Sequence, residues 1–278
     1  MKQSIRIAAV ATFLAAIAAG PALANHAWAN YHWARTANPF TIKIGDNVNS
    51  AWDAYLGNSV ADWAVTTGSC NNASNPVRLN PVAGSVSNLR RCTALSGTIQ
   101  VCNTTYGSNG WLGLASISVN GDHITAGTVK VNDTYFNTAT YNTPAWRRMV
   151  MEQEVGHCFG LGHQDETFAN PDLLDACGRG SCMDYSDNPA NQGTPNQHDY
   201  DQLVTIYSHL DATTTIGANL PPGQAFANGA PDFDLEQVDP DNQATWGVPV
   251  GFRNGRANIF ERVTGNGRKV LTRVLWTE

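Results

Sequence analysis

Charged residues are scarce in this chain. They make up 14% of its 278 residues, against the ~25% of an ordinary soluble domain. With 17 basic and 23 acidic residues the formal charge is −6 at pH 7, so the basic surface that binds nucleic acid is missing. No long run of one charge sign is present either, which excludes a charged interaction tail. We therefore expect no nucleic-acid partner.

Long apolar segments are missing after the first residues. The chain begins with Lys2 and Arg6, continues with the apolar run Ile7–Ala19 and then reaches Ala22-Leu23-Ala24. A positive start, an apolar stretch and a small-residue cleavage site are typical of a secretory signal peptide, here residues 1–24. The apolar run is too short to span a bilayer. The sequence predicts a secreted protein with no membrane partner after signal cleavage.

Cysteine is present in a number that fits an oxidising compartment. The six cysteines are Cys70, Cys92, Cys102, Cys158, Cys177 and Cys182. They form one group of three before the central helix and one group of three around its end. Either one bridge joins the groups or two thiols stay free. We predict a local disulfide between Cys92 and Cys102.

Apolar periodicity predicts both strands and helices. Strands are expected at residues 40–44, 98–103, 112–119 and 124–131, and a C-terminal hairpin at residues 259–263 and 269–276 around Gly265-Asn266-Gly267. A capping box at Ser50 and Asp53 opens a first helix that runs to Trp63, and a third helix carries Tyr200 to Tyr207. Residues 66–88 are expected to form a long loop.

The second helix carries the residues that indicate chemistry. Thr143 is its expected N-cap and Pro144 its first residue. Near its end stands the segment QEVGHCFGLGH, which starts at Gln153. Gln153 and His157 are four residues apart, so both side chains can face one metal ion.

The residues after the helix complete this pattern. Gly160 lets the chain leave the helix with a positive φ, so His163 can fold back under the same ion. Glu154 lies beside these ligands and can take a proton from an activated water. Cys158 points about 100° away from its neighbour His157 on the helix, so we do not expect a Cys–His nucleophile.

This segment resembles the signature of the metzincin zinc metallopeptidases, H-E-x-x-H-x-x-G-x-x-H followed by a methionine turn. Glu154, His157, Gly160 and His163 match it, and Gln153 stands where the family has its first histidine. The segment SCMDYSD, which contains Met183 and Tyr185, resembles the methionine turn, with a pappalysin-like sequence and matrixin-like compactness overall.

The resemblance implies an α+β fold, with a twisted, mostly parallel sheet, an antiparallel edge strand, an active-site helix, a methionine turn and a C-terminal helix. It implies one zinc ion held by Gln153, His157 and His163, and Glu154 as the general base. Met183 would pack beneath the metal, and Tyr185 would stabilise the oxyanion. It further implies a protein or peptide substrate and a monomer.

Gln153 weakens the metal site more than it changes the chemistry. Its side-chain oxygen reaches about as far as the distal histidine nitrogen and is equally neutral, but zinc prefers imidazole nitrogen to an amide oxygen. A compensating ligand can come from another side chain. The candidates are His123, Asp165, Glu166, Tyr185 and His198. His26, His32 and His209 are expected to carry no site.

We divide the chain into a signal peptide (residues 1–24), a metzincin-like metallopeptidase domain (25–210), a linker or extended loop (211–245) and a β-hairpin C-terminal extension (246–278). A peptide substrate is expected to add as a strand to the sheet edge at residues 112–119. No cysteine lies between Asn25 and Cys70, so latency through a pro-segment cysteine has no basis in the sequence.

The predicted function is that of a secreted zinc-dependent metalloendopeptidase. The alternative from another class is a non-catalytic binding or scaffold protein that kept the metzincin fold while Gln153 replaced a ligand. A second alternative is a module in which the metal ion is purely structural. Peptide cleavage that depends on Glu154 separates the enzyme from both.

Overall fold

The computed structural model describes residues 25–66, 75–84, 86, 88–166, 174–185, 189–217, 233–236 and 238–277. The predicted signal peptide and Cys70 lie outside these residues. The strands are β1 (His32–Trp33), β2 (Phe40–Asn47), β3 (Val77–Ala83), β4 (Thr98–Thr104), β5 (Trp111–Asn120), β6 (His123–Asn132), β7 (Val248–Arg253), β8 (Arg256–Gly265) and β9 (Arg268–Trp276). The helices are α1 (Asp53–Trp63), α2 (Asp133–Phe136), α3 (Pro144–His157), α4 (Gln197–Ile206) and α5 (Phe233–Glu236).

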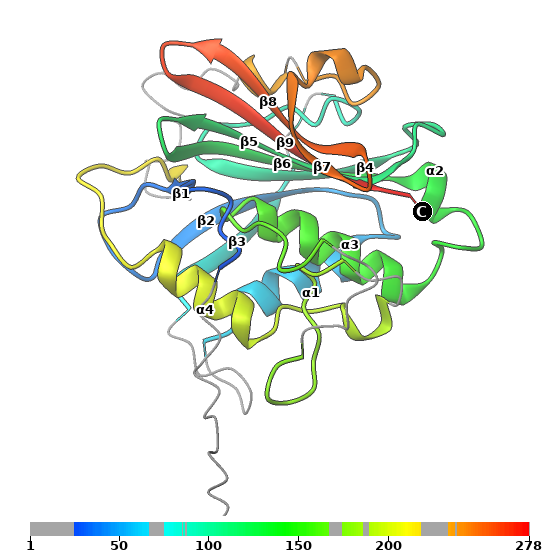
Figure 1. Cartoon of the computed structure of the whole chain (residues 1–278), viewed down its shortest axis with the longest axis horizontal. Coiled ribbons are helices and arrows are strands. Elements are labelled where there is room, and N and C mark those ends of the chain that lie inside the picture. The colour runs from blue at the N-terminus through cyan, green and yellow to red at the C-terminus, as the bar shows by residue number, and fades with distance from the viewer. Residues whose placement is uncertain are drawn as a thin grey trace, which may run out of the picture.

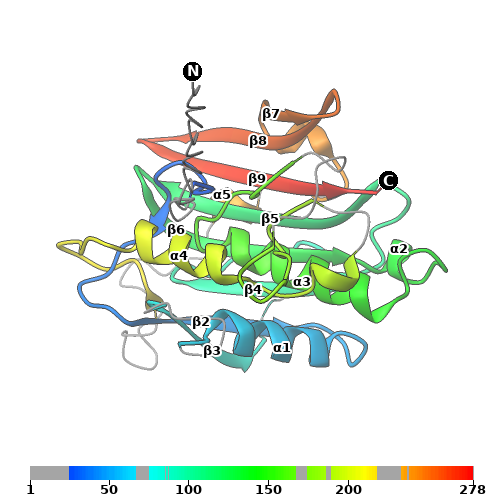
Figure 2. The ribbon, with the colours of Figure 1, turned by 60° about the horizontal axis from the view of Figure 1, so that its bottom comes forward.

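One mixed sheet organises the molecule, in the order β3-β2-β4-β6-β5-β9-β8-β7, with β1 paired to β6. The strands β3, β2, β4 and β6 are parallel, whereas β5, β9, β8 and β7 follow in antiparallel pairs. Helices α1, α3 and α4 cover one face (Figures 1 and 2). The fold is therefore α+β, as the sequence predicted. No helix in the described ranges is long and apolar enough to cross a membrane.

The expectation that residues 112–119 lie at the sheet edge is wrong, whereas an antiparallel edge strand is present at β7. Strand β5 pairs with β6 on one side and with β9 on the other, where Leu114 lies opposite Val274 and Ile117 opposite Leu271. The C-terminal strands β7, β8 and β9 thus continue the sheet beyond β5 (Figure 2). A peptide cannot add to β5 while β9 holds its backbone groups, so the substrate strand predicted at residues 112–119 is wrong as well.

Two local predictions also fail. Part of the loop expected at residues 66–88 forms β3, an edge strand parallel to β2, where Pro81 is tolerated because one side of the strand faces no partner. The capping box expected at Ser50 is absent, since Trp52 takes the N-cap position of α1 without a side-chain cap. The indole of Trp52 is buried and donates to Asp133 Oδ1 at 2.8 Å, so tertiary packing sets this helix start.

Helix α3 begins and ends where the sequence predicts. Thr143 accepts a hydrogen bond from Trp146 N at 3.2 Å, and Pro144 is the first residue. Gly160 has φ +89°, and a Cβ atom there would collide with the carbonyl oxygen of Tyr31. The chain can therefore turn sharply after α3 only with glycine at this position.

Apolar cores lie on both faces of the sheet. The larger core contains Trp33, Trp63 and Phe159, on the face that carries the helices. The second core contains Trp111, Trp246 and Trp276, on the face of α5 and the C-terminal strands. Because both faces are covered, polar groups on the central strands are buried as well.

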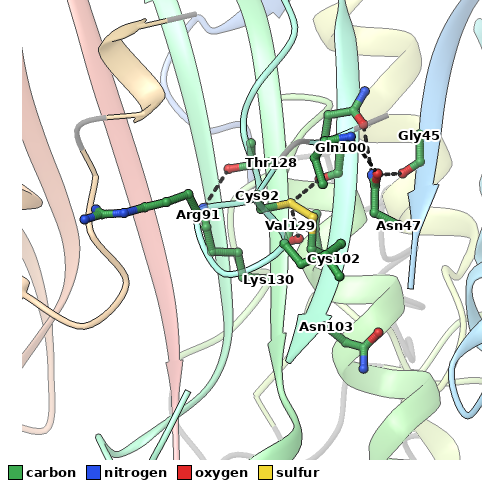
Figure 3. The surroundings of a disulfide bond; sticks show 12 residues. Gly45, Asn47, Arg91, Cys92, Gln100, Cys102, Asn103, Thr128, Val129 and Lys130 are labelled. Carbon is green, nitrogen blue, oxygen red and sulfur yellow. Dashed lines mark hydrogen bonds between the residues drawn. A yellow bond between two sulfur atoms is a disulfide. The ribbon is translucent and has the colours of Figure 1, made fainter. Parts of the chain in front are cut away.

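The cysteine prediction is confirmed at Cys92–Cys102, which ties the segment before β4 to that strand (Figure 3). Cys177 is also disulfide-bonded. Cys158 and Cys182 are buried free thiols, which matches the alternative in which two thiols stay unpaired.

Lys130 of β6 is a buried ammonium in this sheet, close to the disulfide (Figure 3). Its Nζ donates to Thr128 Oγ1 at 3.3 Å. Burial lowers the pKa of Lys130 from 10.5 to about 8. The unfolded chain therefore binds more protons than the folded chain between pH 8 and 10.5, and this lysine favours unfolding most at low pH.

Lys130→Met is expected to raise the free energy of unfolding by about 1–3 kcal/mol at pH 7, because it removes a charge whose desolvation is only partly compensated. The gain is expected to shrink towards pH 10.5, where the folded lysine is already neutral. Urea unfolding at the two pH values measures it, with Lys43→Met as the control. A loss of stability at pH 7, or a gain that does not depend on pH, would contradict this explanation.

Candidate metal centre

The buried end of α3 presents Gln153, Glu154 and His157, which are 0%, 1% and 1% exposed. Gly156 allows the close packing behind them: a Cβ atom there would lie 2.6 Å from Met183 Sδ and 2.6 Å from a ring carbon of Trp63. Met183 therefore packs directly against the helix, beside the polar residues. The polar end of α3 is enclosed and cannot be satisfied by bulk water.

His157 and His163 meet through their distal nitrogens. The Nε2 atoms lie 3.0 Å apart, whereas tetrahedral zinc with bonds of about 2.0–2.1 Å places its ligands about 3.3 Å apart. His157 Nδ1 lies 2.9 Å from the carbonyl oxygen of Leu161, and His163 Nδ1 lies 2.8 Å from Glu166 Oε1. The Leu161 carbonyl holds the proton of His157 on Nδ1. At His163 the Glu166 carboxylate accepts from Nδ1, and Arg273 Nη1 lies 3.1 Å from the same nitrogen. With Nδ1–H donated to Glu166, both Nε2 lone pairs face the same point.

The two imidazoles are neutral at pH 7. Burial lowers the pKa of His157 well below its usual value, and the neighbouring His163 and Arg273 act in the same direction. Burial also lowers the pKa of His163, to about 4, against the opposing hydrogen bond to Glu166. Neutral imidazole is the form that binds a metal ion.

Gln153 carries a buried side-chain oxygen one helical turn before His157 on α3. Its Nε2 donates to the carbonyl oxygen of Cys182 at 2.9 Å, which fixes the orientation of the amide. Its Oε1 is fully buried and has no hydrogen-bond partner among the described residues. A buried acceptor without a partner costs about 1–3 kcal/mol, and an ion coordinated by this oxygen would remove that cost.

Glu154 follows Gln153 on α3 and presents a buried carboxyl group. Neither carboxylate oxygen has a hydrogen-bond partner in the described part of the chain. The side chain lies against β5, where a Cβ atom on Gly113 would come within 2.6 Å of Glu154 Oε1. Burial raises the pKa of Glu154 well above its usual value, and the charge of Arg273 opposes this shift. The raised pKa favours the protonated form of the Glu154 carboxyl group.

Glu166 and Arg273 form the outer layer of the centre. Arg273 Nη1 lies 3.4 Å from Glu166 Oε1. Burial alone would raise the pKa of Glu166, but the hydrogen bond from His163 and the charge of Arg273 outweigh it and lower the pKa to about 2. Glu166 is therefore ionised and orients the imidazole of His163, as outer-layer carboxylates do in metal sites.

The methionine-turn segment lies against the same residues. The ring of Tyr185 is 4.3 Å from that of His163, and its side chain is buried. Gln164 N donates to Met183 O at 2.6 Å, and Tyr185 N donates to Asp165 O at 3.1 Å. These two bonds bring the turn onto the chain that follows α3.

Side chains of the C-terminal strands β7, β8 and β9 cover the centre. Arg273 comes from β9, while Arg253 of β7 donates to the carbonyl oxygen of Glu166 at 3.1 Å and stacks on Tyr185 at 3.7 Å. Asn258 of β8 lies 3.5 Å from Glu166 Oε2. Sequence reasoning missed this cover, because the arginines occur far from α3 in a segment expected to form a separate hairpin.

The structure brings some of the proposed substitute ligands to the centre and not others. Glu166 and Tyr185 contact His163. The backbone carbonyl of Asp165 accepts from Tyr185 N in the methionine-turn segment. His123 and His198 lie instead in two other groups of histidine and carboxylate side chains. Those groups also contain His26 and His32, and His209 lies 3.1 Å from His32, although no site was expected for these three histidines.

Comparisons with known proteins give a distant likeness. No protein-family model matches the chain, and no curated protein matches it. Among solved structures the chain is similar to the structure of myroilysin, with a TM-score of 0.36 and 15% sequence identity, over 66% of this chain and 99% of that one. We therefore assign roles to residues from their geometry alone.

Glu166→Gln tests the outer layer through stability. The lowered pKa means that ionised Glu166 stabilises the fold above pH 4.5 and that this contribution is lost as the pH falls towards 2. Because the side chain is 35% exposed, solvent screening reduces the expected loss at pH 7 to about 1 kcal/mol. Urea unfolding in the presence of a chelator measures it at pH 7 and pH 3.

Glu261→Gln is the matched control, since Glu261 pairs with Lys269 on the surface at 3.0 Å. It is expected to change stability less than Glu166→Gln at pH 7. Equal effects of the two variants, or the same loss at pH 3 as at pH 7, would show that the Glu166–His163–Arg273 contacts do not hold the centre.

Proposed function

We propose that this protein is a secreted zinc-dependent metalloendopeptidase whose centre is built on the end of α3. One observation carries the proposal. Two neutral, buried histidines aim their Nε2 atoms at each other across 3.0 Å, beside an amide oxygen and a carboxyl group without hydrogen-bond partners among the described residues. Secretion is supported by the signal-like residues 1–24 and by the Cys92–Cys102 disulfide.

His157, His163 and Gln153 would hold the zinc ion. Two imidazole nitrogens and one carbonyl oxygen form a neutral donor set of the kind that leaves a coordination position open. Bound there, zinc supplies Lewis acidity that activates water and polarises a peptide carbonyl group. Glu166 and the Leu161 carbonyl would keep the two imidazoles in the required tautomer, with the proton on Nδ1.

Glu154 moves the proton. It takes one from the attacking water and gives it to the amine of the leaving peptide. Burial raises its pKa, so the carboxyl holds the proton between these two events. Added positive charge in the centre would lower that pKa and allow Glu154 to begin as the base, in the direction in which Arg273 already acts.

Tyr185 would donate to the oxyanion. Burial raises its pKa above the usual value of 10, so the hydroxyl keeps its proton at neutral pH. Its ring contacts His163, which places it in the same centre. A neutral hydroxyl in a buried site is an effective donor to a developing negative charge.

A specific observation favours a second candidate, the non-catalytic binding or scaffold protein. The side chains of Gln153, Glu154, His157 and Tyr185 are at most 3% exposed, and β9 occupies the strand edge that a peptide would need. Hydrolysis therefore requires that the cover formed by β7–β9 opens, whereas a scaffold would leave it closed.

Glu154→Gln in the zinc-loaded mature chain is expected to lower the hydrolysis of an unfolded protein substrate by about 10²–10⁴-fold, because it removes the proton-transferring group. Glu152→Gln is the matched control. Glu152 is a neighbour on α3 and equally buried. Its pKa is influenced by Asp62 and Ser59, whereas that of Glu154 is influenced by Arg273 of the centre. This control variant is expected to retain turnover.

Turnover that is the same in the Glu154→Gln variant and the wild type would contradict the proposed mechanism. No turnover in the zinc-loaded wild type, under conditions in which limited proteolysis detects opening of the C-terminal strands, would establish the scaffold alternative.

Gln153→His is expected to lower the zinc concentration that gives half-maximal activity by at least about tenfold, since imidazole binds zinc more strongly than an amide oxygen does. Activity reports on this centre alone, whatever other zinc the chain binds. An unchanged or higher half-activating concentration would show that residue 153 does not coordinate the ion.

A further inference from the structure

Three histidines and one carboxylate converge at a place separate from the α3 centre. His32 belongs to β1, His123 begins β6, and His209 and Asp211 follow α4. The Nε2 atoms of the three histidines lie 3.4, 3.3 and 3.7 Å from the same oxygen, Asp211 Oδ1. The ligand atoms of His32, His123 and Asp211 all lie within 4.8 Å of one another, and His209 Nε2 approaches this group beside His32.

The spacing within this group is that of metal ligands. His209 Nε2 lies 3.1 Å from His32 Nε2, and tetrahedral zinc with bonds of about 2.0–2.1 Å sets its ligands about 3.3 Å apart. The ring of His32 meets those of His123 and His209 edge to face, at 82° and 86°. The rings thus spread around a common point instead of stacking on one another.

Other groups hold these ligands in place. His32 Nδ1 lies 2.7 Å from the carbonyl oxygen of Asn30, which keeps the proton there and leaves the Nε2 lone pair facing the group. Asp211 Oδ2 accepts from Arg35 Nη1 at 2.8 Å and from Arg35 N at 3.1 Å. Asp211 therefore points Oδ1 at the histidines with its other oxygen already occupied.

An ion can reach the group from solvent. The side chains of His209 and His123 are 50% and 39% exposed, whereas those of Asp211 and His32 are 10% and 8% exposed. A cleft of about 390 Å³ opens beside them and is lined in part by His32, Asp122 and His209. An ion can therefore enter past the exposed His123 and His209 and reach the buried His32 and Asp211.

We propose that His32, His123 and Asp211 form a binding site for a divalent transition metal, with zinc as the ion that suits two imidazoles and one carboxylate. His209 lies beside His32 and is available as a further ligand. The ion joins β1, the start of β6 and the chain after α4, and with His209 in the fourth position the site is closed and structural. The site does not depend on the proposed hydrolysis.

The neighbouring group of His26, His198 and Asp199 has another explanation. Both carboxylate oxygens of Asp199 accept from Ser181 Oγ, at 2.8 and 2.7 Å, and Oδ2 also accepts from Asn196 N at 2.8 Å. Asp199 thereby closes the capping box of α4. Its oxygens serve the helix and the methionine-turn segment, so this group is the control in the test.

The test is the zinc content of the mature chain, loaded with zinc chloride and dialysed, measured by elemental mass spectrometry. The double variant His123→Ala/His209→Ala is expected to hold one zinc fewer per chain than the wild type. This difference is expected whether the α3 centre is occupied or empty, so failure of the proposed function does not affect the result. His198→Ala is expected to retain the wild-type content.

Thermal unfolding provides a second readout. Because the ion binds the folded chain, added zinc is expected to raise Tm more in the wild type than in the double variant. Since both replaced histidines are partly exposed, the variant is expected to fold, and circular dichroism checks it. If it does not fold, His123→Gln alone is expected to weaken zinc binding at least tenfold.

Equal zinc content in the wild type and the double variant would overturn the proposed site. A loss of zinc in His198→Ala with none in the double variant would overturn it too, because the ion would then lie in the neighbouring group.

Discussion

The burial of the polar end of α3 is the constraint on which the rest of the structure depends. A helix that carries Gln153, Glu154 and His157 on its inner side cannot lie against an apolar core without partners for these groups. Gly156 brings the helix close to Met183, and Cys182 anchors the Gln153 amide. Among the described residues the Gln153 amide oxygen and the Glu154 carboxyl group stay without a hydrogen-bond partner, as do the carboxylate oxygens of Glu152. Next to two imidazoles, an unpaired oxygen and carboxyl group are what a metal ion and a substrate would complete.

The C-terminal strands link this centre to the stability of the whole sheet. Strand β9 pairs with β5 over its length, and its Arg273 contacts Glu166. Arg253 of β7 stacks on Tyr185. The same strands build the second apolar core with Trp246 and Trp276. Opening the centre to a peptide therefore has to disrupt pairing and apolar packing together, so access to the centre and the integrity of β7–β9 are coupled.

Local signals in the sequence were enough for α3. Thr143, Pro144 and Gly160 mark its two ends, and the spacing of residues 153 to 163 gives the shared direction of the ligands. Long-range pairing was beyond such signals, because β9 reads as one arm of a hairpin whether or not it also joins β5. The group of His32, His123, His209 and Asp211 could not be predicted for the same reason. Its ligands come from three distant segments, and only the short spacing between His209 and Asp211 was visible in the sequence.

Anomalous X-ray diffraction at the zinc absorption edge, from crystals of the zinc-loaded mature chain, locates the metal ion at the end of α3. We expect a peak about 2.0–2.1 Å from the Nε2 atoms of both His157 and His163, with Gln153 Oε1 at coordinating distance. A peak among His32, His123 and Asp211 would not bear on this expectation. Absence of any peak between His157 and His163 in zinc-saturated crystals would contradict it.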